Sequence, residues 1–151
     1  MEQVDEEYPL VLCTVREVGH YSCRSMTGNC SALQTLADEP GYVQISPQDA
    51  DKMRLQDQQL VWVASRRGKV ITRVSVSERI NVGAVYMTYQ LWIGACNELT
   101  LDHLDPISKT PEYKYCAVKL EAITDQTWAE NYVQQEYSQL KARLRREAEV
   151  S

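Results

Sequence analysis

A cluster of hydrogen-bond donors follows a compact apolar run near the start of the chain. The run, residues 8–13, reads Tyr-Pro-Leu-Val-Leu-Cys and is typical of a buried strand. The cluster contains Gly19 and Gly28 as flexible points, and its polar members are Arg16, His20, Tyr21, Ser22, Arg24, Ser25, Thr27 and Asn29. Backbone N–H groups in such a loop, and the N-terminus of a following helix, can bind an anion. Arg16 can hold a phosphate through two parallel hydrogen bonds. A polar surface loop without a ligand would have the same composition.

A second polar group lies later in the chain. Asn97 follows an apolar run, residues 91–96, that we interpret as a strand broken by Gly94. A carboxamide at a strand end can pair with the donor and acceptor edge of a heterocycle. Lys114 adds a cation, and Tyr113 adds a flat surface and a hydroxyl. Taken singly, a turn-forming asparagine and an exposed lysine would look the same.

Cysteine and histidine positions leave two weaker alternatives open. His20, Cys23 and Cys30 could form part of a metal site, but no fourth ligand is evident. Cys23 beside His20 could act as a nucleophile, but nothing supplies a third, orienting group or an oxyanion hole. The glycine motifs that bind nucleotide phosphates and the Gly-x-Ser-x-Gly elbow of hydrolases are absent from the sequence.

Length and composition limit the kinds of partner. The 151 residues suit one domain, and a hydrophobic content of 44% suffices for a core. The formal net charge of −5 argues against nucleic-acid or membrane-surface binding, but it allows a phosphate held by a few local cations. No apolar run approaches the roughly 18 residues of a membrane span. Residues 1–7 are acidic and unlike a signal peptide. We therefore expect a cytoplasmic chain without membrane insertion.

Alternating apolar patterns predict six or seven short strands. Residues 60–65 and 69–76 flank Gly68 and predict a β-hairpin, because Val70, Thr72, Val74 and Val76 share one face. The other strands are expected at 9–15, 42–45, 84–88, 91–96 and 115–123, and short helices at 29–37 and 47–54. Residues 1–7 are expected to form a loose acidic lead, and residues 97–111 a long loop.

The chain is expected to end in a helix over residues 125–147. Thr127 with Glu130 fits a capping box, and Asp125 is an alternative cap. One apolar stripe is formed by Val133, Tyr137, Leu140 and Leu144. The stripe predicts packing on the same domain or docking onto another domain or subunit. The whole inventory fits an irregular β-barrel with helical inserts better than a doubly wound sheet. We expect the hairpin to supply two of its strands, and residues 8–15 and 115–123 the central ones.

Two motifs resemble those of the molybdopterin-dinucleotide-binding domain, the C-terminal domain of the dimethyl-sulfoxide-reductase superfamily. The first is Thr-x-Arg-x-x-x-His-Tyr-Ser at residues 14–22. The second comprises residues 94–100, 105–108 and 111–114. The formate dehydrogenase H type within this superfamily carries residues 14–22 and 109–116 almost unchanged. The likeness extends over residues 7–147.

The resemblance implies a mainly β fold, a six-stranded double-psi β-barrel with short helical inserts and a C-terminal helix, as a single domain over residues 1–151. It also implies binding of the bis(molybdopterin guanine dinucleotide) cofactor of molybdenum or tungsten. Carried over position by position, the cofactor-binding residues are Arg16, Glu17, His20, Ser22, Tyr89, Asn97, Tyr113 and Lys114. We expect these residues to converge on one side of the barrel.

Full-length members of this superfamily are several times longer. They hold a [4Fe–4S] cluster through an N-terminal cysteine array and ligate the metal through cysteine or selenocysteine. None of the five cysteines here falls in either context. The resemblance therefore implies the C-terminal part of a formate dehydrogenase, which oxidises formate to carbon dioxide with two electrons. Alone, this part would not be catalytic, and the remaining domains would be its partners. The alternative is a stand-alone barrel that serves as an interaction module and no longer binds the cofactor.

Overall fold

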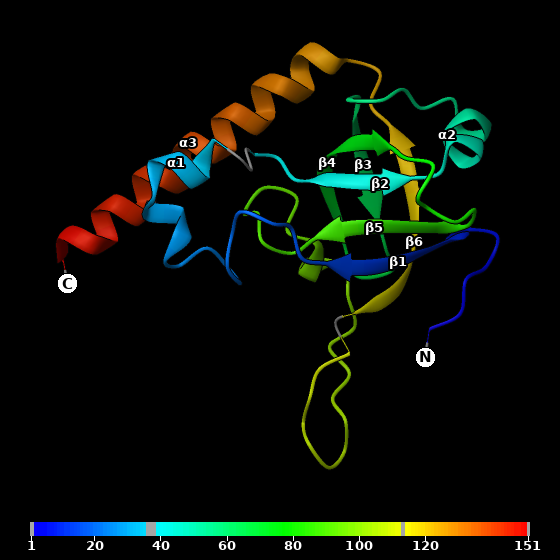
Figure 1. Cartoon of the computed structure of the whole chain (residues 1–151), viewed down its shortest axis with the longest axis horizontal. Coiled ribbons are helices and arrows are strands. Elements are labelled where there is room, and N and C mark those ends of the chain that lie inside the picture. Colours follow the sequence, from blue (N-terminus) through cyan, green and yellow to red (C-terminus); the bar gives the residue numbers. More distant parts are fainter. Residues whose placement is uncertain (1, 36–38, 113, 151) are drawn as a thin grey trace.

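Six strands form a closed barrel in the computed structural model, which describes residues 2–35, 39–112 and 114–150 (Figure 1). The order around the barrel is β1-β5-β2-β4-β3-β6. β1 pairs in parallel with β5, as β2 does with β4, and the other neighbouring pairs are antiparallel. The strands are β1 (Leu10–Val15), β2 (Tyr42–Ile45), β3 (Leu60–Ala64), β4 (Lys69–Val76), β5 (Ala84–Thr88) and β6 (Tyr115–Ala122). The predicted six-stranded double-psi barrel is confirmed.

The barrel core follows from the alternation in the strands. Every second residue of β1, namely Leu10, Leu12 and Thr14, is buried, because successive side chains of a strand point to opposite faces. Val63 of β3 and Val85 of β5, both fully buried, pack in the same cluster. The predicted hairpin is present, with Val61 opposite Thr72 and Val63 opposite Val70.

The helix α2 (Pro47–Met53) begins where the sequence predicts it. Ser46 is its N-cap, and the Ser46 hydroxyl accepts a hydrogen bond of 3.1 Å from Asp49 N. Arg54 closes the helix in the left-handed conformation, with φ of 56°. The helix expected over residues 29–37 is shorter: a 3₁₀ turn, η1 (Thr27–Asn29), precedes α1 (Ser31–Gln34), and residues 36–38 lie outside the described residues.

The strand expected over residues 91–96 is wrong. Trp92 N and Ile93 N donate to the carboxylate of Glu39, at 3.0 Å each, instead of to a neighbouring strand. Gly94 then turns the chain with φ of 77°, and its backbone lies so close to Ile71 O that an added Cβ would stand 2.6 Å from that oxygen. Asn97 consequently lies in a second 3₁₀ turn, η2 (Cys96–Glu98), and not at a strand end.

The acidic lead is not loose in the part that the structure describes. Glu2 forms ion pairs with Arg66, at 2.7 Å, and with Arg67, at 2.8 Å. Its carboxylate also accepts a hydrogen bond of 2.9 Å from Ala117 N. Asp5 pairs with Arg66 as well. Two adjacent arginines in the β3–β4 turn thus hold the lead against the barrel.

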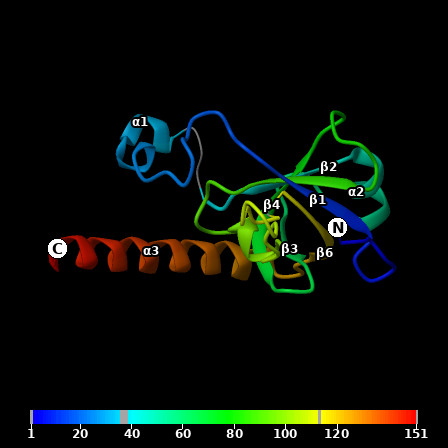
Figure 2. The same ribbon diagram turned by 90° about the horizontal axis from the view of Figure 1, so that it is seen from below.

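The terminal helix α3 (Gln126–Val150) packs on the barrel through its first half. Its cap is Asp125, whose carboxylate accepts a hydrogen bond of 2.8 Å from Trp128 N, so the box formed by Thr127 and Glu130 is wrong. Ala129 and Val133 are fully buried and form a second core cluster with Leu60, Ile71 and Ile123. The second half of α3 extends past the barrel on the same side as α1, and Figure 2 shows a gap between the two helices. Among the described residues, no helix is long and apolar enough to cross a membrane.

Candidate functional site

The parallel pairing of β1 and β5 creates the site. Val15, the last residue of β1, lies opposite Thr88, the last residue of β5. The residues that follow each strand therefore leave the same end of the barrel side by side. β6 is antiparallel to β1, so it begins at this end, and Thr14 N donates a hydrogen bond of 3.2 Å to Lys114 O.

Tyr89 connects the two predicted groups of binding residues. Arg16 Nε donates a hydrogen bond of 2.7 Å to the hydroxyl oxygen of Tyr89. Lys114 Nζ lies 5.2 Å from the centroid of the Tyr89 ring, which is a cation–π distance. Arg16 and Lys114 are both exposed, and Tyr89 is half-buried between them. Two cations and an aromatic hydroxyl thus share one patch at this end of the barrel.

Glu17 is fixed through its backbone. Its N–H donates to Gln90 Oε1 at 2.5 Å, and Gln90 Nε2 donates to His20 O at the same distance. The Glu17 side chain is half-buried. Burial raises the pKa of the Glu17 carboxyl, and the positive charge of Arg24 opposes that rise.

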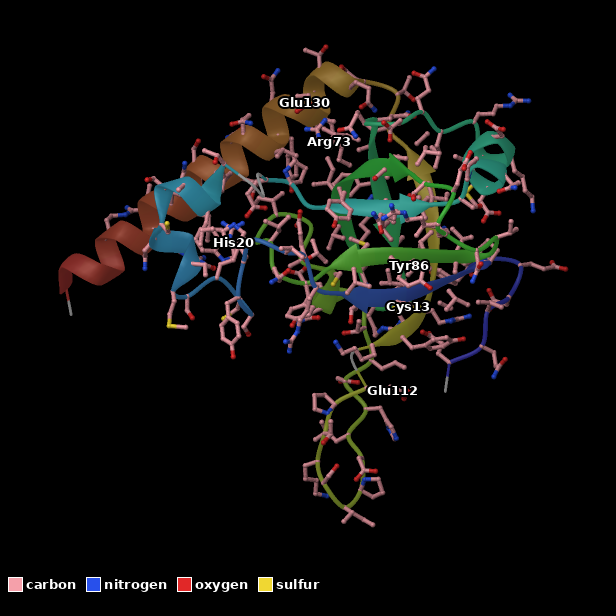
Figure 3. The ribbon with its side chains drawn as sticks, in the orientation of Figure 1. Cys13, His20, Arg73, Tyr86, Glu112 and Glu130 are labelled. Carbon is pink, nitrogen blue, oxygen red and sulfur yellow. The ribbon has the colours of Figure 1, made fainter. Side chains whose placement is uncertain are left out.

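His20 and Ser22 lie in the loop that follows β1. The His20 ring is buried, with Nδ1 3.0 Å from Thr27 Oγ1, and the loop folds over it between β1 and α1 (Figure 3). Thr27 Oγ1 also accepts a hydrogen bond of 3.1 Å from Tyr21 N. Ser22 adopts a positive φ of 48°, as does Arg24 with 65°. The loop therefore has a defined conformation that depends on Thr27.

A buried ion pair holds the far part of this loop. Arg24 is 1% exposed and its Nη1 donates to Glu39 Oε1 at 2.8 Å. Its guanidinium carbon lies 4.5 Å from the centroid of a Trp92 ring. Burial raises the pKa of the Glu39 carboxyl, and hydrogen bonds from Trp92 N, Ile93 N and Arg24 oppose the rise. Arg24 Nε and Nη2 are buried and make no hydrogen bond within the described part of the chain.

Asn97 makes no hydrogen bond to the other described site residues. Its backbone oxygen accepts a hydrogen bond of 3.0 Å from Thr100 Oγ1, and its side chain is exposed. The charge of Lys114 acts on the thiol of Cys96, the residue before Asn97. Burial raises the pKa of Cys96 to about 12, helped by Cys116, and Lys114 opposes the rise.

Tyr113 lies outside the described residues. Of the other predicted residues, the structure brings Arg16, Tyr89 and Lys114 into contact and fixes the backbone of Glu17 and His20 beside them.

Sequence reasoning missed Gln90 and did not recognise Arg24 and Glu39 as a pair. A signal for Gln90 was available, because it follows β5 as Glu17 follows β1, and polar residues after parallel strands meet at one edge. Arg24 was noted as one donor among many. Nothing in the sequence around Arg24 indicated that it would form a buried ion pair with Glu39, 15 residues later.

The family described as "Molydopterin dinucleotide binding domain" matches residues 10–117. The chain belongs to this family. It is 64% identical to formate dehydrogenase H of Escherichia coli over 148 residues, which are 98% of the chain and 21% of that protein. It is 41% identical to the F420-dependent formate dehydrogenase 2 subunit alpha of Methanococcus maripaludis over 122 residues, 81% of the chain and 18% of that subunit.

A solved structure shares the fold of this molybdopterin-dinucleotide-binding domain. Acetylene hydratase from Pelobacter acetylenicus matches with a TM-score of 0.67 at 18% identity, over 78% of the chain and 19% of that protein. The chain thus spans about a fifth of the length of each of these relatives.

The donor set fits the dinucleotide that gives the family its name. Arg16 and Lys114 are exposed cations that can neutralise phosphate charge, and Arg16 presents a planar fork. Asn97 adds an exposed amide with both a donor and an acceptor. Within residues 2–35, 39–112 and 114–150, no cluster of three or more histidine, cysteine, aspartate or glutamate side chains could hold a metal ion.

Proposed function

We propose that this domain binds the bis(molybdopterin guanine dinucleotide) cofactor as the C-terminal domain of a formate dehydrogenase, which oxidises formate to carbon dioxide. The observation that carries the proposal is the contact of Arg16 and Lys114 with Tyr89, which joins two motifs about a hundred residues apart at one end of the barrel. The formate dehydrogenase relatives support the reaction. When bound, the molybdenum or tungsten of the cofactor supplies the two-electron redox centre.

Each site residue has a role that follows from its chemistry. Arg16, His20 and Ser22 bind pyrophosphate and pterin oxygens, since the first carries a fixed charge and all three have polar hydrogens. Asn97 and Lys114 bind a pterin edge, and Tyr89 holds Arg16 in place. Glu17 lies in the same loop as Arg16, His20 and Ser22. Tyr113 completes the set in the proposal, although it lies outside the described residues.

The rest of the proposal concerns the context of the domain. Residues 1–151 form one domain that supplies one wall of the cofactor crevice. The remaining domains of the parent enzyme, which hold the [4Fe–4S] cluster and the metal ligand, are its partners in the cytoplasm. Alone, the chain does not oxidise formate, because it supplies neither of those groups. A stand-alone interaction module that has lost the cofactor is the second candidate, and the retention of Arg16, Asn97 and Lys114 together argues against it.

The test places this domain in a complete enzyme. Residues of this chain replace the matching 148-residue segment of formate dehydrogenase H, to give an enzyme that we call the exchange enzyme. Arg16→Ala is compared with Arg73→Ala, a matched control that removes an arginine paired with Glu130 on α3 (Figure 3). Metal and pterin content of the purified proteins are then measured.

The expected result is a loss of cofactor in Arg16→Ala alone, because phosphate charge is left without compensation. Arg16→Ala should cost under about 1 kcal/mol in the free energy of unfolding, as is usual for an exposed residue. Equal cofactor content in both variants would contradict the role of Arg16. Formate-dependent dye reduction by the 151-residue chain alone would contradict its dependence on the other domains. An exchange enzyme that folds without any cofactor would favour the interaction module.

A further inference from the structure

The loop that bears most of the proposed contacts is held by one short segment. We call residues 16–30 the donor loop and residues 88–93 the anchor segment. Tyr89 accepts the hydrogen bond from Arg16, and Gln90 bonds to Glu17 and His20. Further along the anchor segment, Trp92 lies against the guanidinium of Arg24. The donor loop therefore depends on the anchor segment along much of its length.

Gln90 makes the most specific of these contacts. Its side chain is 1% exposed, Oε1 accepts the hydrogen bond from Glu17 N, and Nε2 donates to His20 O. Thr88 helps to orient the amide, since its hydroxyl accepts from Gln90 N at 3.2 Å and donates to Gln90 Oε1 at 3.3 Å. A side-chain amide presents one acceptor and one donor group, so it can satisfy an N–H and a carbonyl of the same loop.

We propose that Gln90 is a positioning residue for the cofactor: it holds the donor loop in the conformation that presents Arg16 and Ser22. This inference rests on the proposed function and adds a residue that has no contact with the ligand in that proposal. The physical reason is the cost of ordering a loop upon binding, which is avoided when the loop is already ordered. Gln90 fixes the backbone on both sides of Val18 and Gly19, where the chain would otherwise be free to move.

Arg24 and Glu39 form a second anchor that acts on a later part of the donor loop. Glu39 binds Arg24 through one oxygen and accepts hydrogen bonds from Trp92 N and Ile93 N. Residues 18 and 19 lie between Glu17 and His20, the two residues that Gln90 contacts. Residues 21–23 lie between His20 and Arg24, where the second anchor acts. Removal of the Gln90 amide should thus loosen the loop near Glu17 and leave Arg24 in place.

The chain contains a matched control for Gln90. Gln126 makes the same pair of contacts elsewhere: its Oε1 accepts from Leu60 N at 2.8 Å, and its Nε2 donates to Leu60 O at 2.9 Å. Leu60 begins β3. This strand runs in the same direction as β1, because both strands pair antiparallel with β6. Gln126 therefore lies at the opposite end of the barrel from the donor loop. Methionine replaces glutamine with similar length and no strong hydrogen-bonding group.

The first test measures amide hydrogen exchange in the 151-residue chain. In Gln90→Met, the Glu17 amide should exchange about tenfold faster than in the unmodified chain, since it loses its acceptor. In Gln126→Met, the Leu60 amide should change and Glu17 should not. An unchanged Glu17 rate in Gln90→Met overturns the inference. If Gln90→Met does not fold, Gln90→Glu replaces it: the acceptor for Glu17 N remains, and the exchange rates around His20 should rise instead.

The second test measures metal and guanine nucleotide content in the exchange enzyme. Gln90→Met should lower both at least threefold relative to Gln126→Met, and Arg16→Ala should lower them as well. If Arg16→Ala loses cofactor and Gln90→Met matches Gln126→Met, the positioning role is overturned and the proposed function stands. If Arg16→Ala keeps full cofactor content, the proposed site fails and the positioning role fails with it. The two failures are therefore distinguishable.

Discussion

Arg16 Nε donates a hydrogen bond to the hydroxyl of Tyr89 at 2.7 Å, although 73 positions separate the two residues. The contact is possible because β1 and β5 run in parallel and end side by side. It orients the exposed guanidinium through Nε, so the terminal nitrogens can donate to another acceptor. Lys114 stands over the ring of the same tyrosine, so one aromatic residue orders two cations of the proposed cofactor site.

Tyr89→Phe tests whether this orientation matters. The variant keeps the ring under Lys114 and removes the acceptor for Arg16. We expect a loss of under about 1 kcal/mol in the free energy of unfolding, because a hydrogen bond at the surface contributes little net stability. Cofactor content of the exchange enzyme should nevertheless fall. Tyr86→Phe, on β5 and opposite Cys13, is the control and should change neither quantity. Equal cofactor content in the two variants would show that Tyr89 does not orient Arg16 for binding.

Much of the barrel was predictable because its strands alternate buried and exposed residues. β2 and β5 begin and end at the predicted residues, and the hairpin of β3 and β4 follows from the glycine turn between two alternating runs. The candidate site residues come from motifs, and the structure brings three of them, Arg16, Tyr89 and Lys114, into contact. Their convergence was expected as well, since one ligand contacts them all.

Other features depend on long-range contacts that leave no local pattern. Residues 91–96 are apolar enough for a strand, but the carboxylate of Glu39 takes two of their N–H groups and Gly94 turns the chain. Asp125 and Thr127 are equally good caps in sequence, and only the start of α3 at Gln126 decides between them. Partners of this kind are set by the fold and not by sequence spacing.

Two glycines with positive φ provide a prediction on the turn that precedes Asn97. Gly94 and Gly83 have φ of 77° and 81°, so alanine is strained at either position. An added Cβ would stand 2.6 Å from Ile71 O at Gly94, whereas nothing lies within 4 Å at Gly83. Urea unfolding should show a loss of about 1 kcal/mol for Gly83→Ala and about 2–4 kcal/mol for Gly94→Ala. Similar losses for both variants would mean that the backbone of Gly94 does not lie close to Ile71 O in β4.

Glu2 makes the stability of the chain depend on pH in the acid range. Burial raises the pKa of its carboxyl, but hydrogen bonds from Arg67, Ala117 N and Arg66 outweigh burial and lower the pKa from 4.5 to about 2. A lowered pKa means that the stabilisation is fully present above the unfolded value of 4.5. It is lost as pH falls from there towards 2.

The corresponding variant is Glu2→Gln, with Glu6→Gln as an exposed control. At pH 7, Glu2→Gln should lower the free energy of unfolding by about 1–2 kcal/mol, less than the full shift of the pKa would give, because solvent screens the charges of the partly exposed arginine partners. The difference from the unmodified chain should shrink between pH 4.5 and pH 2, and it should be near zero at the lower limit. Urea unfolding over this range provides the measurement. A difference that is constant with pH would contradict the assignment to the Glu2 carboxylate.

The buried pair of Arg24 and Glu39 should be strongly coupled. Both side chains are at most 1% exposed, so removal of either partner leaves a polar or charged group buried without its counterpart. Arg24→Met and Glu39→Gln should each cost about 3–5 kcal/mol in the free energy of unfolding. The double variant should cost less than the sum by about 1–3 kcal/mol, because the second change removes the group that the first left unpaired. Arg73→Met and Glu130→Gln, a pair on β4 and α3 that is accessible to solvent, form the control cycle and should couple by under about 1 kcal/mol. Urea unfolding at pH 7 gives both cycles, and additive losses at Arg24 and Glu39 would show that the pair does not hold the donor loop to the anchor segment.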